Sequence, residues 1–158
     1  MRGRFLVSAD SHSIEYRILN KGVPLDLAKL KEFGKRYAKA WCSQDPAKVA
    51  AFFAEGGSLS VNRGSPAVGR DAIAEVARGF MTTFPDMVVT MDNLVQQPRG
   101  VAFHWTLTGT YLGPEGTGQR VRISGYEMWQ IDAHGLITKS DGHFDSAEYE
   151  RQLEHGYA

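Results

Sequence analysis

The chain has 158 residues, of which 42% are hydrophobic and 23% charged, as expected for one globular domain with a sizeable core. Its 18 basic and 18 acidic side chains balance and are dispersed, which excludes electrostatic capture of nucleic acid or of an anionic membrane as the main function. Cys42 is the single cysteine, so an intrachain disulfide and a multi-cysteine zinc site are excluded.

No apolar run approaches the roughly 20 residues that span a bilayer, so we expect no membrane association. Phe5–Val7 is too short for the apolar part of a signal peptide. We therefore expect a cytoplasmic protein. Residues 1–24 alternate weakly, which leaves open two short strands, an arm or a partly disordered leader, and residues 25–158 are expected to form a single domain.

Three helices are expected before most of the strands. From Leu25, apolar residues recur with a period near 3.6, which predicts a helix that ends at residues 43–45. Asp45 before a proline predicts the N-cap of a second helix over Pro46–Ala54. Asp71 is expected to cap the third helix, which ends at Phe84 because a proline follows.

The remaining chain reads mainly as strands and turns. The expected strands are Ser58–Asn62, Met87–Val95, Val101–Tyr111, Arg120–Asp132 and Leu136–Asp145, and Ser146 is expected to cap a last helix, Ala147–Glu154. Helices followed by a run of strands predict an α+β fold with helices on one face of an antiparallel sheet. Gly109, Gly125 and Gly142 predict bends that curve the sheet into a cone, whose mouth is a natural small-molecule site.

The last strand carries the predicted catalytic residues. Asp141, His143 and Asp145 alternate and therefore share one strand face. A carboxylate beside an imidazole in a dry pocket can act as a general acid or base, and a histidine titrates near neutral pH. The alternatives are that Asp141 is solvated, that His143 is structural and that Asp145 caps the last helix.

The predicted ligand-binding residues lie on the two preceding strands: His104, Trp105, Tyr126, Glu127 and Trp129. Glu127 shares strand parity with apolar Val121, Ile123, Trp129 and Ile131, where an unpaired carboxylate would be costly. It is therefore functional, or it is bonded to an arginine such as Arg63 or Arg122. Tyr126 or Tyr111 could donate to an oxyanion, and no spacing of ligand residues indicates a metal site.

Several short motifs, in this order, resemble the SnoaL-like polyketide cyclase branch of the NTF2-like superfamily: Val68–Ile73, Phe84–Asp86, His104–Thr110, Val121–Gly125, Gly135–Ile137 and Phe144–Asp145. The superfamily also holds relatives of ketosteroid isomerase and limonene epoxide hydrolase. The resemblance spans about residues 25–156. It implies a cone-shaped, cystatin-like α+β fold, a homodimer formed through the sheet, and an apolar pocket for a hydrophobic small molecule without metal or cofactor.

One position departs from the family. Cyclase-like members carry a His-Trp-Asp run on the last strand, with the Asp as acid/base, and these positions fall on Ser140, Asp141 and Gly142. Either a bulge near Gly142 turns Asp141 inward, or the protein does not use that carboxylate, since one strand step reverses the face.

Three functions remain open. The first is a cofactor-independent acid/base enzyme (a cyclase, isomerase or hydrolase) for a hydrophobic cyclic or carbonyl-bearing substrate. Asp141 or His143 would be its base, and Tyr126 or His104 its proton donor. The second is a small-ligand binding protein without turnover, and the third is a dimeric interaction module of the same fold.

Overall fold

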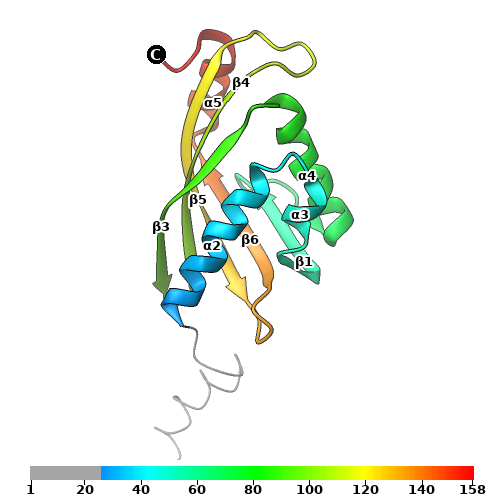
Figure 1. Cartoon of the computed structure of the whole chain (residues 1–158), viewed down its shortest axis with the longest axis vertical. Helices are drawn as coiled ribbons and strands as arrows, with labels where there is room; N and C mark the ends of the chain where they lie inside the picture. Colours follow the sequence, from blue (N-terminus) through cyan, green and yellow to red (C-terminus); the bar gives the residue numbers. More distant parts are fainter. Residues whose placement is uncertain (1–25) are drawn as a thin grey trace, which may run out of the picture.

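The computed structural model describes residues 26–158, so the expectations for residues 1–24 lie outside the described residues (Figure 1). The elements in chain order are helices α2 (Leu27–Trp41) and α3 (Pro46–Ala50), strands β1 (Phe53–Val61) and β2 (Ala67–Val68), helix α4 (Arg70–Thr83), strands β3 (Val88–Gln97), β4 (Gly100–Thr110), β5 (Arg120–Ile131) and β6 (Ile137–Phe144), and helix α5 (Ser146–His155). No helix in this part of the chain is long and apolar enough to cross a membrane.

Helix α2 forms as its periodicity predicts. Asp26 caps it by accepting a hydrogen bond from the Ala28 backbone N–H at 2.9 Å. Its buried face includes Tyr37, which is fully buried, and Trp41. Because Gly34 has no side chain, the helix approaches β3 closely: a Cβ there would lie 2.6 Å from the sulfur of Met91.

The second helix is shorter than expected. Asp45 caps α3 as predicted, but the helix ends at Ala50, and the strand begins already at Phe53. The Phe52 carbonyl accepts from the backbone N–H of Ile137, and β1 runs parallel to β6. This pairing with a distant strand overrides the local helical signal, which is a general limit of propensity.

Two helix starts also differ from expectation. Gly69, at φ 93°, is the N-cap of α4 and makes no side-chain cap bond, so Asp71 lies in the first turn. There its negative charge interacts favourably with the positive end of the helix dipole, but its side chain does not cap the helix. Asp145, not Ser146, caps α5, because its carboxylate accepts from the Glu148 backbone N–H at 3.0 Å. The capping alternative for Asp145 is therefore confirmed.

The α+β fold is confirmed, with one difference in the sheet. The six strands have the order β2-β1-β6-β5-β4-β3, and the β1–β6 pair is parallel while the others are antiparallel. The sheet is twisted, and α2, α3 and α4 lie on the same side of it (Figure 1). We call the face toward these helices the inner face and the opposite one the outer face. Alternate residues of each strand point to the two faces.

Candidate functional site

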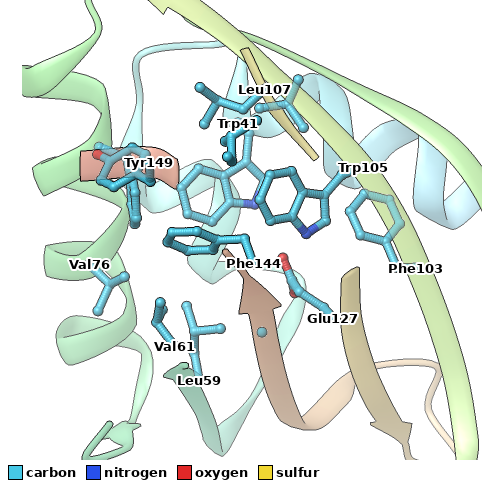
Figure 2. Close-up of a pocket in the computed structure, with 14 residues that line it drawn as sticks. Trp41, Leu59, Val61, Val76, Phe103, Trp105, Leu107, Glu127, Phe144 and Tyr149 are labelled. Carbon is cyan, nitrogen blue, oxygen red and sulfur yellow. The ribbon is translucent and has the colours of Figure 1, made fainter. Parts of the chain in front are cut away.

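A cavity of about 60 Å³ lies between the inner face and helices α2, α4 and α5 (Figure 2). Its lining is almost wholly apolar and comes from eight elements: Trp41, Leu59, Val61, Val76, Phe80, Val89, Phe103, Trp105, Leu107, Ile123, Glu127, Gly142, Phe144 and Tyr149. A single water needs roughly 10–15 Å³ by this measure, so the cavity has room for a small molecule. Among these lining residues, Glu127 alone has an ionisable carboxyl group.

The carboxyl group of Glu127 is held through one of its two oxygens. Oε1 accepts hydrogen bonds from the Tyr37 hydroxyl at 2.9 Å, the Trp129 indole N–H at 2.9 Å and the Ser140 hydroxyl at 2.7 Å. These donors come from α2, β5 and β6. Within residues 26–158, Oε2 accepts no hydrogen bond, and Glu127 is one of the residues that line the cavity. The arrangement fixes the carboxyl group and leaves one oxygen available.

Burial governs the ionisation of this cluster. The Glu127 side chain is 7% exposed, and desolvation raises its pKa above the ordinary value. The hydrogen bonds from Trp129, Ser140 and Tyr37 act in the opposite direction because they favour the carboxylate, but burial prevails. Burial, and next the charge of Glu127, raise the pKa of Tyr37 well above 10.0, so Tyr37 stays a neutral donor.

Two tryptophan side chains of the cavity wall have buried indole N–H groups. Within the described part of the chain, the buried N–H groups of Trp41 and Trp105 make no well-aligned hydrogen bond, although the Trp41 N–H is near enough to the Tyr37 hydroxyl to act against the rise of the Tyr37 pKa. The indole of Trp129, by contrast, is bonded to Glu127. In Figure 2 the Glu127 carboxyl group points toward the rings of Trp41 and Trp105.

The predicted catalytic residues lie on the outer face. The β5–β6 register is regular from Gly125 to Gln130, so no bulge near Gly142 turns Asp141 inward. Asp141 accepts from the Ser60 hydroxyl at 2.8 Å and lies 3.8 Å from the Lys139 ammonium. His143 packs beside Tyr126, with ring centres 5.0 Å apart. The structure therefore places Asp141 and His143 on the same face of β6, away from the cavity.

The predicted ligand-binding residues divide between the two faces. Trp105 and Glu127 line the cavity, and Trp129 is fully buried behind Glu127. His104 and Tyr126 lie on the outer face, with ring centres 5.7 Å apart.

The arginine alternative for Glu127 is wrong, because Tyr37, Trp129 and Ser140 bind its carboxyl group while Arg63 and Arg122 are exposed. The sequence reasoning missed Tyr37 and Ser140 as its partners. The only signal for Tyr37 was its place on the apolar face of the predicted first helix. The only signal for Ser140 was its alignment with the first position of the His-Trp-Asp motif of the family. Across residues 26–158, no three His, Cys, Asp or Glu side chains are grouped so that they could hold a metal ion.

No curated protein matches the chain by sequence. Among solved structures, a ketosteroid isomerase-like protein from Catenulispora acidiphila DSM 44928, in complex with trimethylamine, has a TM-score of 0.68 at 16% identity and covers 77% of this chain and 92% of its own. The epoxide hydrolase/cyclase-like enzyme SalBIII, which has a role in pyran ring formation in salinomycin, has a TM-score of 0.66 at 19% identity, with 77% and 95% covered.

An NTF2-like protein from Burkholderia pseudomallei K96243 has a TM-score of 0.66 at 18% identity, with 78% of this chain and 95% of its own covered. At these identities the solved structures show the fold alone. The model of the SnoaL-like domain matches residues 35–140, and the chain therefore belongs to the SnoaL-like family.

Proposed function

We propose that the protein is a cofactor-independent acid/base enzyme that acts on a small hydrophobic, carbonyl-bearing or cyclic molecule, with Glu127 as the group that moves the proton. The observation that carries the proposal is the asymmetry of this carboxyl group in an apolar cavity. Three donors hold Oε1, and Oε2 accepts no bond within the described residues. A carboxylate whose pKa is raised by burial is a stronger base than one in water.

The geometry supports a simple proton transfer. Oε2 takes a proton from the carbon next to a carbonyl; the C–H electron pair forms the C=C bond of an enolate, and the carbonyl π pair moves to oxygen. Oε2 then returns the proton to the same carbon or to another one. The second outcome is an isomerisation, and capture of the enolate carbon by an electrophile of the same molecule is a cyclisation. The apolar walls offer water few hydrogen-bond partners, and a less polar surrounding strengthens the interactions of the carboxylate with a developing charge.

The comparison with SalBIII agrees with this proposal, since that neighbour is described as an epoxide hydrolase/cyclase-like enzyme. The proposal places the acid/base group on β5, whereas the family resemblance places it on β6 at Gly142. The two positions are opposite each other in the sheet, because Glu127 pairs with Gly142. A carboxyl group on either strand therefore reaches the same cavity.

The test uses exchange of the α-protons of cyclopentanone for deuterium in D₂O, followed by NMR, because it needs no knowledge of the natural substrate. The wild-type protein should accelerate exchange over buffer, and Glu127→Gln should remove on the order of 10²-fold or more of that acceleration. The amide oxygen of glutamine keeps an acceptor for Tyr37, Trp129 and Ser140, so the fold should persist.

The matched control is the pair Asp141→Asn and His143→Gln on the outer face, which should exchange at the wild-type rate. If Glu127→Gln retains full exchange while one of the outer-face variants loses it, the assignment of the base to Glu127 is wrong.

A non-catalytic ligand-binding function is the second candidate, favoured by the almost wholly apolar lining of a small cavity. In that case cyclopentanone should raise the melting temperature, and its α-protons should exchange no faster than in buffer. The same sample distinguishes the two functions.

A further inference from the structure

A second hollow, of about 500 Å³, lies on the outer face, where β5, β6, the turn after β1 and the start of α5 meet. This volume falls in the range of roughly 300–1,000 Å³ that is typical of small-molecule sites. We call this hollow the outer groove. The polar side chains that line it are Asn62, Arg63, Ser124, Tyr126, His143 and Ser146. Most of them are exposed, so a ligand from solution can reach them.

Arg63 occupies a backbone position that suits glycine. The turn is closed by the Gly64 backbone N–H, which donates to the Val61 carbonyl at 2.9 Å, and its two central residues, Asn62 and Arg63, have φ values of 50° and 66°. Two successive positive φ values are typical of a type I′ turn, in which asparagine is favoured first and glycine second. The chain has the asparagine, but an arginine takes the place of the glycine.

The conformation of Asn62 has a structural cause, and that of Arg63 has none in the turn itself. The Asn62 side-chain oxygen accepts from the Phe144 backbone N–H at 2.9 Å, and its backbone N–H donates to the Gly142 carbonyl at 2.8 Å. These bonds tie the turn to the end of β6. Backbone strain of the kind that Arg63 carries is concentrated at ligand-binding positions, where the side chain compensates for it. The position of Arg63 over the outer groove therefore points to a use for its guanidinium group.

We infer that the outer groove binds an aromatic carboxylate, with Arg63 as the partner of the carboxylate group. A guanidinium presents a planar fork of N–H donors that matches the two oxygens of a carboxylate. The salt bridges among residues 26–158 use the basic side chains of Lys35, Arg78, Arg120, Lys139, Arg151 and His155, and Arg63 takes part in none of them. The inference goes beyond the proposed function, since the outer groove lies on the opposite face from Glu127.

The charges around the outer groove favour a monoanion. No Asp or Glu belongs to the described residues that line it, and Arg63 is always charged. Asp145 is the nearest acid along the chain, but its carboxylate caps α5 by accepting from the Glu148 backbone N–H. One permanent positive charge matches one carboxylate better than it matches a phosphate dianion. The hydroxyl groups of Tyr126 and Ser146 supply further donors.

The aromatic part of the ligand follows from the floor of the outer groove. The Tyr126 side chain is 36% exposed, although it is large and largely apolar. Its ring lies beside the His143 imidazole on the neighbouring strand, with ring centres 5.0 Å apart and planes inclined by 33°. Two adjacent rings offer a broad surface on which a flat aromatic group can stack.

The experiment compares benzoate with benzamide, which has nearly the same shape without the charge, by titration followed in the ¹H–¹⁵N spectrum of the full chain. Benzoate should bind on the order of 10-fold more tightly, because its hydrogen bonds to Arg63 are charge-assisted. The shifted backbone signals should gather at residues 62–63, 124–126 and 143–146. Phenyl phosphate should bind no more tightly than benzoate, and cyclohexanecarboxylate should bind several-fold more weakly because it lacks a flat ring.

Two variants of Arg63 separate ligand binding from folding. Arg63→Gln removes the charge and should weaken benzoate binding on the order of 10-fold. Arg99→Gln is the matched control, because Arg99 is exposed in the β3–β4 turn and does not line the outer groove, and its benzoate affinity should equal that of the wild type. Arg63→Gly should also lose binding, yet its melting temperature should be at least that of the wild type, since glycine adopts a φ of 66° without strain.

Several outcomes would overturn the inference. They are equal affinity for benzoate and benzamide, tighter binding of phenyl phosphate or of cyclohexanecarboxylate, an equal loss of binding in Arg99→Gln, and signal shifts that gather at the inner cavity instead. A lower melting temperature of Arg63→Gly would show that Arg63 serves the turn and not a ligand. Sedimentation of the same variants tests a second copy as the occupant: a change of oligomeric state without a change in benzoate binding would also overturn the inference.

Discussion

Glu127 and Gly142 lie directly opposite each other in the β5–β6 pair, and a Cβ added at residue 142 would lie 3.7 Å from the Cγ of Glu127. Both residues line the cavity. The position at which the family resemblance expects an acid is thus occupied by a glycine, and the space next to it holds the carboxyl-bearing side chain of the neighbouring strand. A second carboxyl group at residue 142 would meet the first.

This relationship predicts that Gly142→Asp is destabilising at neutral pH. The new carboxyl group would lie beside Glu127 in an apolar cavity, where two neighbouring carboxyl groups cannot both ionise without a large free-energy cost. We expect a free energy of unfolding lower by about 2 kcal/mol or more than that of Gly142→Ala, with a smaller difference at acid pH. Chemical denaturation at several pH values measures it.

Gly142→Ala is the matched control, because it introduces the same Cβ without charge. That Cβ lies 3.3 Å from the Ser60 carbonyl oxygen, a tight contact that is common to both variants. If the two variants are equally stable at neutral pH, Glu127 does not face residue 142 as a charged group.

A second prediction concerns Tyr37→Phe, which removes one of the three donors to Oε1. Since this hydrogen bond favours the ionised form, its loss should raise the pKa of Glu127 further. The pH profile of α-proton exchange should therefore move to higher pH. Tyr111→Phe is the control, because it removes a phenol hydroxyl that is not bonded to Glu127, and its profile should coincide with that of the wild type.

The third prediction is a pH dependence of stability with a defined sign. Because burial raises the pKa of Glu127 above 4.5 in the folded state, the folded chain binds more protons than the unfolded chain between these two pKa values. The contribution of Glu127 to stability is present below the unfolded pKa and is lost as pH rises through the folded pKa. Glutamine does not titrate, so Glu127→Gln should gain stability relative to the wild type as pH rises.

The measurement is urea denaturation of both proteins from about pH 4 to about pH 8. Other titrating groups are common to the two chains and largely cancel in the difference. Parallel curves would show that the ionisation of Glu127 is the same in the folded and unfolded states.

The sequence predicted those features of the fold that depend on residues close together in the chain. Strand parity placed Glu127 with Trp129 on a buried face, and the structure confirms this, because alternation along one strand fixes its two faces. The predicted start of the first strand was wrong, because parallel pairing of β1 with the distant strand β6 determines where β1 begins. The partner of Glu127 is likewise distant: Tyr37 is 90 residues away, and only the packing of α2 on the sheet brings it there.

The side of Asp141 shows the same limit. Its parity with His143 is local and was foreseen, but which face points inward depends on the register between β5 and β6. The lack of a well-aligned hydrogen bond at the Trp41 and Trp105 indoles is a property of the whole cavity wall, and no spacing in the sequence encodes it.

The last prediction links the backbone to the cavity through Gly125. A Cβ at this residue would lie 2.3 Å from the His143 carbonyl oxygen and 2.6 Å from Cζ2 of Trp105, so β5 must give way or the indole must move. We expect Gly125→Ala to lower the free energy of unfolding by about 2–3 kcal/mol, as overpacking does. Because Trp105 lines the cavity, the variant should also weaken cyclopentanone binding.

Gly79→Ala is the control, since Gly79 lies in the exposed part of α4 and a Cβ there would have no neighbour within 4 Å. It should stabilise the protein by roughly 0.5–1 kcal/mol, because alanine favours a helix over glycine. Urea denaturation measures the change in the free energy of unfolding, and the ¹H–¹⁵N signal of the Trp105 indole in the NMR spectrum reports whether the ring has moved. A Gly125→Ala protein with wild-type stability and an unmoved Trp105 signal would show that the ring does not depend on this glycine for its place in the cavity wall.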